Sequence, residues 1–404
     1  MTSPPSDQAG SNAISQSPQP RVLIACGGMV IVAGNERMTA EVIRALVQSG
    51  AAVHCIVNDW ENHRIAALME SAGATWSPGF YNYTLVRSGA SLIDRARTIR
   101  NIFSTSTGML ATARDFDASH VLFTDFLGVL KNLPAIIRLR IKGIPILLSV
   151  ADAPPESRFY LRLWRTFINP FVDKFVCNSA YIQGLLQRQG VPPGKILVIR
   201  NVAPTRREST KADSPKRDDR IAFVGQIIPG KGLHHLVEAV GILARRGRRA
   251  TVLVIGSDTR WEHPSYEGYR DSVKTLTRKL GIEDRIEFAG EREDVPSLLS
   301  SSAIHCCPSL PELREAFGVV VVEAKIAGIP SVIFKSGALA ELVRHRVDGW
   351  ICEAATPEHL AEGLEYFLIN PRLTTAAGAE ARASSQEFSQ ASFAKSWLTL
   401  FVGG

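Results

Sequence analysis

Short apolar runs alternate along the chain with longer stretches whose apolar residues recur at helical spacing. Residues 21–26 form the first run and end in Gly27-Gly28, which predicts a buried strand followed by a loop. Residues 36–49 place their apolar side chains on one helical face, and Gly50 stands where a helix commonly ends. Strands are then predicted at 52–57, 120–124, 144–150, 174–177 and 196–199, with helices at 65–72, 130–142 and 181–189.

The alternation stops at residues 204–219, where the chain becomes polar, charged and poor in apolar residues. This composition predicts a linker. The pattern then starts again and continues to a final amphipathic helix at 389–401. The second half predicts strands at 220–224, 251–255, 286–289, 303–307 and 331–334, with helices at 233–246, 269–280, 295–300 and 319–327.

Two such halves predict an α/β protein with two Rossmann-like, doubly wound domains that face each other across a cleft. We place the domains at residues 21–203 and 220–385, joined by the linker at 204–219. The aromatic residues of the segment 386–404 are expected to pack back on the first domain. Residues 1–20 have almost no apolar content and predict a disordered leader. Ligands bind beyond the carboxyl ends of parallel strands, so two facing sheets suit a two-substrate reaction.

The composition supports a globular, cytosolic protein. The chain has 404 residues, of which 45% are hydrophobic and 21% charged, enough for two cores. It contains no apolar run of about 18 residues, so no membrane span is expected. The amino terminus lacks the basic and apolar segments of a signal peptide. The six cysteines lack metal-ligand spacing and are expected to be buried, reduced thiols.

The net charge of +7 indicates an anionic partner. An anionic ligand, nucleic acid and an anionic membrane surface are the three alternatives. Basic residues cluster at 95–100, 138–142 and 245–249, but no nucleic-acid-binding module is present, so nucleic acid is not expected. An anionic ligand and peripheral contact with an anionic membrane both stay open.

The candidate chemistry centres on Glu315 and Glu323, which lie eight residues apart. We expect Gly318 to separate them, with Glu315 in a loop after a strand and Glu323 in the following helix. The amino terminus of that helix would present free N–H groups to a phosphate at the strand ends. Both glutamates could instead be exposed surface charges. However, the apolar run VVVVEAKIAG around Glu323 argues against a freely solvated position.

The stretch P-S-x5-E-x-F-G-x4-E-A-x3-G-x-P at 308–330 resembles the E-x7-E signature of retaining family 4 glycosyltransferases with the GT-B fold. Four further stretches resemble parts of the same family: 33–57, 176–204, 223–232 and 336–350. Together they cover about residues 21–401. The resemblance makes the first domain the acceptor side and the second the domain that binds the donor nucleotide.

The resemblance implies roles for individual residues at the donor site. Glu315 would be catalytic and contact hydroxyls of the donor sugar, whereas Glu323 would hold the ribose hydroxyls. Lys231 would be catalytic too, because its ammonium group would meet the leaving diphosphate. Gln226 stands where the family often has an arginine. The remaining implied donor-binding residues are Gly34, Gly225, Ala316, Phe317 and Gly318.

The acceptor side departs from the family pattern. Many relatives carry a histidine after the strand at 144–150, but this chain has Ala151 followed by Asp152. Asp152 could polarise the acceptor hydroxyl as a catalytic residue, or it could be an ordinary turn residue. Asp125, after the strand at 120–124, is a second acceptor-side candidate, again with a turn as the alternative. His120, His234 and His305 are interpreted as structural or solvated.

The second half of the chain, which resembles the donor domain, contains no Asp-x-Asp pair, so we expect neither a bound metal nor a cofactor. The expected function is retaining transfer of a sugar from a nucleotide-diphosphate sugar to a hydroxyl of a saccharide or lipid-linked acceptor. The first alternative is a sugar-nucleotide epimerase or phosphorylase of the same architecture. The second is a non-catalytic partner subunit, which Gln226 and Ala151 would favour. A nicotinamide-dependent oxidoreductase is disfavoured, because no complete G-x-G-x-x-G follows the first strand.

Overall fold

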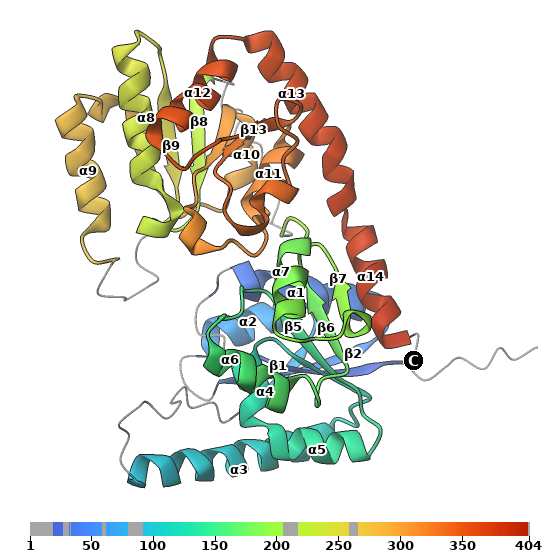
Figure 1. Ribbon diagram of the computed structural model, residues 1–404. Coiled ribbons are helices and arrows are strands. Elements are labelled where there is room, and N and C mark those ends of the chain that lie inside the picture. The colour runs from blue at the N-terminus through green and yellow to red at the C-terminus, as the bar shows by residue number, and fades with distance from the viewer. Residues whose placement is uncertain are drawn as a thin grey trace, which may run out of the picture.

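A computed structural model shows two α/β domains stacked one above the other (Figure 1). It describes residues 19–26, 32, 34–58, 62–79, 92–204, 217–257 and 266–402, and only the backbone of residues 92, 94–98 and 402. Most of the predicted leader, residues 1–18, and most of the predicted linker, residues 205–216, lie outside this range.

The first domain contains a seven-stranded parallel sheet with the order β3-β2-β1-β4-β5-β6-β7. The order reverses between β1 and β4, and such a switch point is where doubly wound sheets bind ligands. The strands are β1 (Arg21–Ala25), β2 (Ala52–Asn58), β3 (Thr75–Gly79), β4 (His120–Phe123), β5 (Ile146–Val150), β6 (Lys174–Cys177) and β7 (Ile196–Val198).

Helices cover both faces of this sheet, which explains why its strands are nearly continuous apolar runs. One face packs against α3, α5 and α7, and the other against α1, α2 and the last helix of the chain, α14 (Gln390–Val402). The helices of this domain are α1 (Gly34–Gln48), α2 (His63–Ser71), α3 (Leu92–Asp115), α4 (Phe126–Lys131), α5 (Leu133–Ile141), α6 (Arg158–Leu163) and α7 (Ala180–Arg188).

The second domain has a six-stranded parallel sheet with the order β10-β9-β8-β11-β12-β13. Its switch point lies between β8 and β11. The elements are β8 (Arg217–Val224), α8 (Leu233–Arg245), β9 (Thr251–Ile255), α9 (Tyr269–Leu280), β10 (Ile286–Gly290), α10 (Val295–Ser300), β11 (Ser302–Cys307), α11 (Val319–Ala327), β12 (Ser331–Ile333), β13 (Gly349–Ile351), α12 (Pro357–Leu368) and α13 (Pro371–Ser384).

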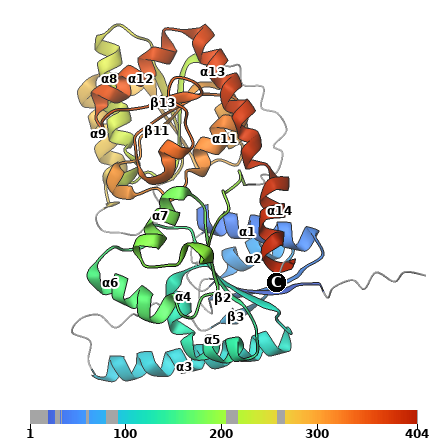
Figure 2. The ribbon, with the colours of Figure 1, turned by 45° about the vertical axis from the view of Figure 1, so that its right-hand side comes forward.

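The end of the chain returns to the first domain through α14 (Gln390–Val402), drawn in red beside that domain in Figures 1 and 2. Phe393, Trp397 and Phe401 are buried in the same core cluster as Ile43 and Leu46 of α1. These aromatic side chains tie the last segment of the chain to the first domain.

The predicted fold class is confirmed, but several elements differ from the expected ones. The helix expected at 130–142 is two helices, α4 and α5, because the chain breaks at Asn132 and Pro134 opens α5. Strand β8 begins at Arg217, inside the expected linker. The elements β3, α3, α6, β13, α12 and α13 were not expected from the sequence.

Candidate active site

A cavity of about 760 Å³ lies between the two domains, at the carboxyl ends of both sheets. Thr124 and Asp125 line it after β4, Asp152 after β5, and Asn178 after β6. From the second domain, Gln226 lines it after β8. The two switch points therefore face a common space, which gives each sheet access to one substrate.

Lys231 and Glu315 form the charged centre of the donor side. Nζ of Lys231 donates to Oε1 of Glu315 at 2.6 Å, and the Ser309 hydroxyl donates to the same oxygen at 2.6 Å. Burial alone would lower the pKa of Lys231 and raise that of Glu315. The attraction between the two charges, together with the hydrogen bonds of the Glu315 carboxylate, outweighs burial, so the pKa of Lys231 is raised and that of Glu315 is lowered. Both groups are ionised at neutral pH.

Two glycines let the loops of this centre approach closely. Gly232 follows Lys231 at φ +70°, and a Cβ there would lie 2.0 Å from the carbonyl oxygen of Pro308. Gly318 has φ +121°, and a Cβ would meet the Leu339 side chain at 2.4 Å. A side chain at either position would be strained by the positive φ, and at Gly232 it would also meet the backbone of Pro308. Gly318 precedes α11, and its neighbour Val319 lines the cavity.

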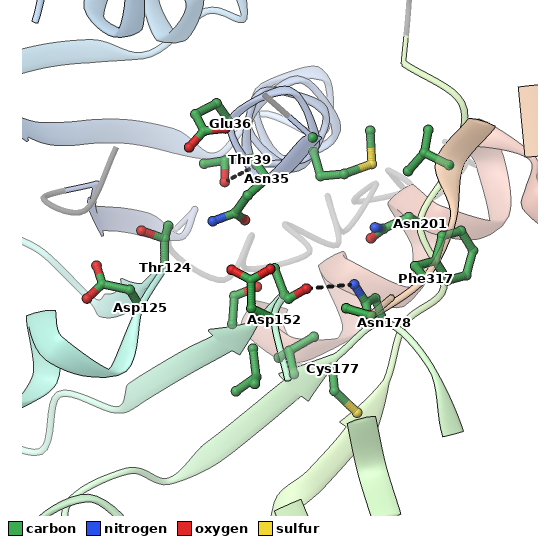
Figure 3. A pocket seen from close by; sticks show the side chains of 18 of the residues that line it. Asn35, Glu36, Thr39, Thr124, Asp125, Asp152, Cys177, Asn178, Asn201 and Phe317 are labelled. Carbon is green, nitrogen blue, oxygen red and sulfur yellow. Dashed lines mark hydrogen bonds between the residues drawn. The ribbon is translucent and has the colours of Figure 1, made fainter. Parts of the chain in front are cut away.

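The first domain lines the cavity with carboxylates and neutral polar groups. Figure 3 shows Asn35, Glu36 and Thr39 of α1 across the cavity from Asp152 and Asn178. The Thr39 hydroxyl donates to the Asn35 carbonyl at 3.0 Å, which holds the first turn of α1. This side is suited to hydroxyl groups, which both donate and accept hydrogen bonds.

Asp152 is reached by water, but protein surrounds it on most sides. This desolvation raises the pKa of Asp152, and the negative charge of Glu315 raises it further. Asp152 is thus a better proton acceptor than an ordinary aspartate. Asp125 has a structural role, because its Oδ1 accepts a hydrogen bond from the Gly128 N–H at 2.7 Å and so caps α4.

The structure brings ten of the eleven sequence-predicted site residues to this cavity. The exception is Glu323, which is buried on α11 and does not line the cavity. It lies four residues after Val319, so it is on the same helical face and one turn further from the opening. The residues that line the cavity are Gly34, Asp125, Asp152, Gly225, Gln226, Lys231, Glu315, Ala316, Phe317 and Gly318.

Sequence reasoning missed several polar residues of the site. Ser309 lies six residues before Glu315 in the same segment between β11 and α11, and its hydroxyl orients the Glu315 carboxylate. Thr124 and Asn178 come directly after β4 and β6, and that position was the signal that could have found them, whereas Asn201 lies three residues after β7. Asn178 donates weakly to the Ala151 carbonyl at 3.5 Å (Figure 3).

A set of contacts next to the cavity joins the two domains. The Glu341 carboxylate accepts from the Ala180 and Tyr181 N–H groups, at 3.0 and 2.6 Å, and so caps α7 from the other domain. The Ser179 hydroxyl donates to the carbonyl of Ala316 at 2.7 Å. Arg314 reaches across to Glu156 at 2.9 Å. These polar contacts hold the two domains together beside the cavity.

Within the described residues, no group of three or more His, Cys, Asp and Glu side chains is placed to hold a metal ion. The same part of the chain contains no helix of the length and apolar character needed to cross a membrane. All six cysteines are free and buried.

Two family profiles match the chain in succession. "Glycosyltransferase Family 4" matches residues 32–207, and "Glycosyl transferases group 1" matches residues 205–384. The chain belongs to the family 4 glycosyltransferases. A glycosyltransferase of Haemophilus influenzae is 29% identical over 44% of this chain and 47% of its own length. The D-inositol 3-phosphate glycosyltransferase of Streptomyces griseus is 30% identical over 46% and 40%. The chain spans about half the length of the curated relatives it matches.

Solved structures share the GT-B fold of this glycosyltransferase. Anabaena HepE in complex with UDP has a TM-score of 0.77 at 18% identity, over 95% of this chain and 100% of that chain. WaaG, a glycosyltransferase involved in lipopolysaccharide biosynthesis, has a TM-score of 0.63 at 16% identity over the same shares. These likenesses confirm two facing Rossmann-like domains.

Proposed function

We propose that this glycosyltransferase transfers a sugar from a nucleotide-diphosphate donor to an acceptor hydroxyl with retention of anomeric configuration. The observation that carries the proposal is the Lys231–Glu315 pair, which a two-domain cavity encloses beside the start of α11. A cation and a carboxylate there match the two ends of such a donor, since the diphosphate is anionic and the sugar carries hydroxyls.

On the donor side, Lys231 meets the diphosphate and Glu315 accepts hydrogen bonds from sugar hydroxyls. Charge that develops on the leaving group is stabilised by the ammonium group and by N–H groups around Gly318. Glu323 binds the ribose from the next turn of α11. Related structures of HepE hold UDP and UDP-glucose, which makes UDP-sugars the first donors to test.

On the acceptor side, Asp152 accepts the proton of the attacking hydroxyl. The bond from the anomeric carbon to the diphosphate oxygen breaks, and the new bond to the acceptor oxygen forms on the same face of the sugar. Asp152 is favoured over Asp125 because it interacts electrostatically with Glu315, whereas Asp125 caps α4.

The acceptor is a saccharide without a phosphate at the reacting end. Glu36, Asp125 and Asp152 line the first-domain side, and Lys231 is the one lysine or arginine among the described residues that line the cavity. A phosphate placed near three carboxylates would be repelled. This differs from the relatives named as D-inositol 3-phosphate glycosyltransferases. We place the reaction in the cytosol, which six free cysteines support.

The test incubates the full chain with UDP-sugars, with and without neutral saccharide acceptors and their phosphorylated counterparts. The proposal predicts UDP release and a glycoside only with an acceptor, faster with the neutral one. Proton NMR of the product should show the anomeric configuration of the donor. A product with inverted anomeric configuration would contradict retaining transfer. A new sugar nucleotide formed without acceptor would indicate another reaction in place of transfer. Background turnover across all donors would favour the non-catalytic partner.

A further inference from the structure

Helices α3 and α5 lie side by side at the end of the first domain that is remote from the second (Figures 1 and 2). Met109 and Ala113 of α3 share a core cluster with Ala135, Ile136 and Leu139 of α5. Both helices therefore pack on one face of the seven-stranded sheet, and their outer surfaces point the same way.

These outer surfaces expose large apolar side chains. Ile141 is 81% exposed and Ile93 is 72% exposed, the two highest values among large hydrophobic residues in the described part of the chain. Phe103, Ile99 and Ile137 are 60%, 57% and 43% exposed. Ile137 and Ile141 are four residues apart, as are Ile99 and Phe103, so each pair lies on one helical face. Because the fold buries none of these five side chains, they leave an apolar surface that suits a partner.

Basic residues lie among these apolar ones. Arg138 and Lys142 each follow an exposed isoleucine of α5 and are exposed, as is Arg100 on α3. The eight residues Ile93, Ile99, Arg100, Phe103, Ile137, Arg138, Ile141 and Lys142 are called the α3–α5 face below.

The third basic cluster of the sequence is different. In the second domain, Arg246 and Arg248 both contact Glu365 at 2.6 Å, and Arg249 lies 3.1 Å from Asp219. The acidic partners partly neutralise these positive charges, which also lie on the other domain. Positive charge and exposed apolar side chains therefore coincide at α3 and α5.

We propose that the α3–α5 face docks the protein on an anionic lipid surface. Isoleucine and phenylalanine side chains enter the boundary between head groups and acyl chains, while Arg100, Arg138 and Lys142 contact lipid phosphates. A second copy of the chain fits this face less well, because a two-fold contact would set its cations against their own copies. The face lies away from the cleft, so docking leaves the second domain free to open and close.

The test is co-sedimentation of the full chain with vesicles. One set is phosphatidylcholine alone, and the other contains about one third phosphatidylglycerol. We expect binding to the anionic vesicles and weak binding to the neutral ones. The double variants Ile137→Asn with Ile141→Asn, and Arg138→Gln with Lys142→Gln, should each lower the partition coefficient at least about tenfold.

Matched controls come from the second domain. Ile369 and Leu373 are also exposed and four residues apart, and Arg278 and Lys279 are exposed on α9. The variants Ile369→Asn with Leu373→Asn, and Arg278→Gln with Lys279→Gln, should bind vesicles as the wild type does. Circular dichroism and thermal unfolding check that all variants fold.

Two results would overturn the proposal. One is absence of binding to anionic vesicles by the wild type. The other is binding that the α5 variants leave unchanged. Sedimentation velocity tests whether a second copy of the chain occupies this face instead. If the wild type forms a dimer that the double variant Ile137→Asn with Ile141→Asn dissociates, and does not bind vesicles, the face is a dimer interface.

Discussion

Lys231 and Glu315 meet at 2.6 Å in the cleft, although 84 residues separate them along the chain. Their side chains are only 24% and 15% exposed. Each keeps the other ionised against the cost of burial, so the site holds a cation and an anion ready before any donor binds. This preorganised pair is the basis of the proposed mechanism.

The first prediction concerns Glu315→Gln. The amide still fills the space, but it removes the negative charge that keeps Lys231 protonated and loses acceptor capacity for sugar hydroxyls. We expect kcat to fall by about 10²-fold. A UDP-release assay measures it. Exposed Glu312, three residues earlier, provides the matched control Glu312→Gln, which should keep wild-type turnover. Equal activity of the two variants would take Glu315 out of the mechanism.

Glu323→Gln should weaken binding of the nucleoside diphosphate without changing the fold. A carboxylate accepts hydrogen bonds from both ribose hydroxyls, whereas an amide presents one acceptor and one donor group. We expect the Kd for UDP to rise by about tenfold. Competition with UMP and with inorganic pyrophosphate separates the ribose effect from the phosphate effect. If pyrophosphate binding weakens equally, the assignment of Glu323 to the ribose is wrong.

Glu341→Ala should loosen the contact between the two domains. The variant removes the carboxylate that caps α7 at Ala180 and Tyr181 across the cleft. We expect a larger radius of gyration in small-angle X-ray scattering without ligand, and a KM for the donor raised by about tenfold. Exposed Glu353 supplies the control variant Glu353→Ala. An unchanged radius together with an unchanged KM would show that this contact does not hold the domains together.

His305 should make the protein less stable in mild acid. It is fully buried, its Nδ1 lies 3.0 Å from the Ser331 hydroxyl, and burial lowers its pKa to about 3. In the unfolded chain this imidazole has its ordinary pKa of 6.5, so below that pH the unfolded chain takes up a proton that the folded protein does not. The free energy of unfolding therefore falls as the pH drops from 6.5 towards 3, by at most about 1.4 kcal/mol per pH unit.

His305→Asn should flatten this dependence, and urea unfolding of both proteins from pH 7.5 to about 5 measures it. The exposed His63 gives the control variant His63→Asn, which should retain the wild-type slope. A parallel slope in the His305 variant would mean that another group causes the loss of stability.

Much of the fold could be predicted because burial leaves a clear pattern. Helices α9 and α11 have the predicted bounds, since apolar spacing, glycine and proline mark their ends. The edge strand β3 was missed, because its residues are mostly exposed and it pairs through backbone hydrogen bonds. Helix α3 was missed because apolar residues also stand on its outer face.

Most residues on the donor side of the cavity could be named from the sequence because they belong to one short motif and one glycine-rich loop, although Glu323 of that motif does not line the cavity. The contacts between domains could not. Glu341 caps α7 and Ser179 reaches Ala316, yet more than 130 residues separate each pair. Such pairs follow from how the domains meet, and a single sequence carries no pattern for that.

The central claim is that Lys231 binds the diphosphate of the donor. Isothermal titration calorimetry with UDP tests it most directly on the wild type, on Lys231→Ala, and on Lys395→Ala as an exposed control. Charge-assisted hydrogen bonds to phosphate predict that Lys231→Ala weakens binding by about tenfold or more, while Lys395→Ala binds as the wild type does. Equal affinity of all three proteins for UDP would contradict the account.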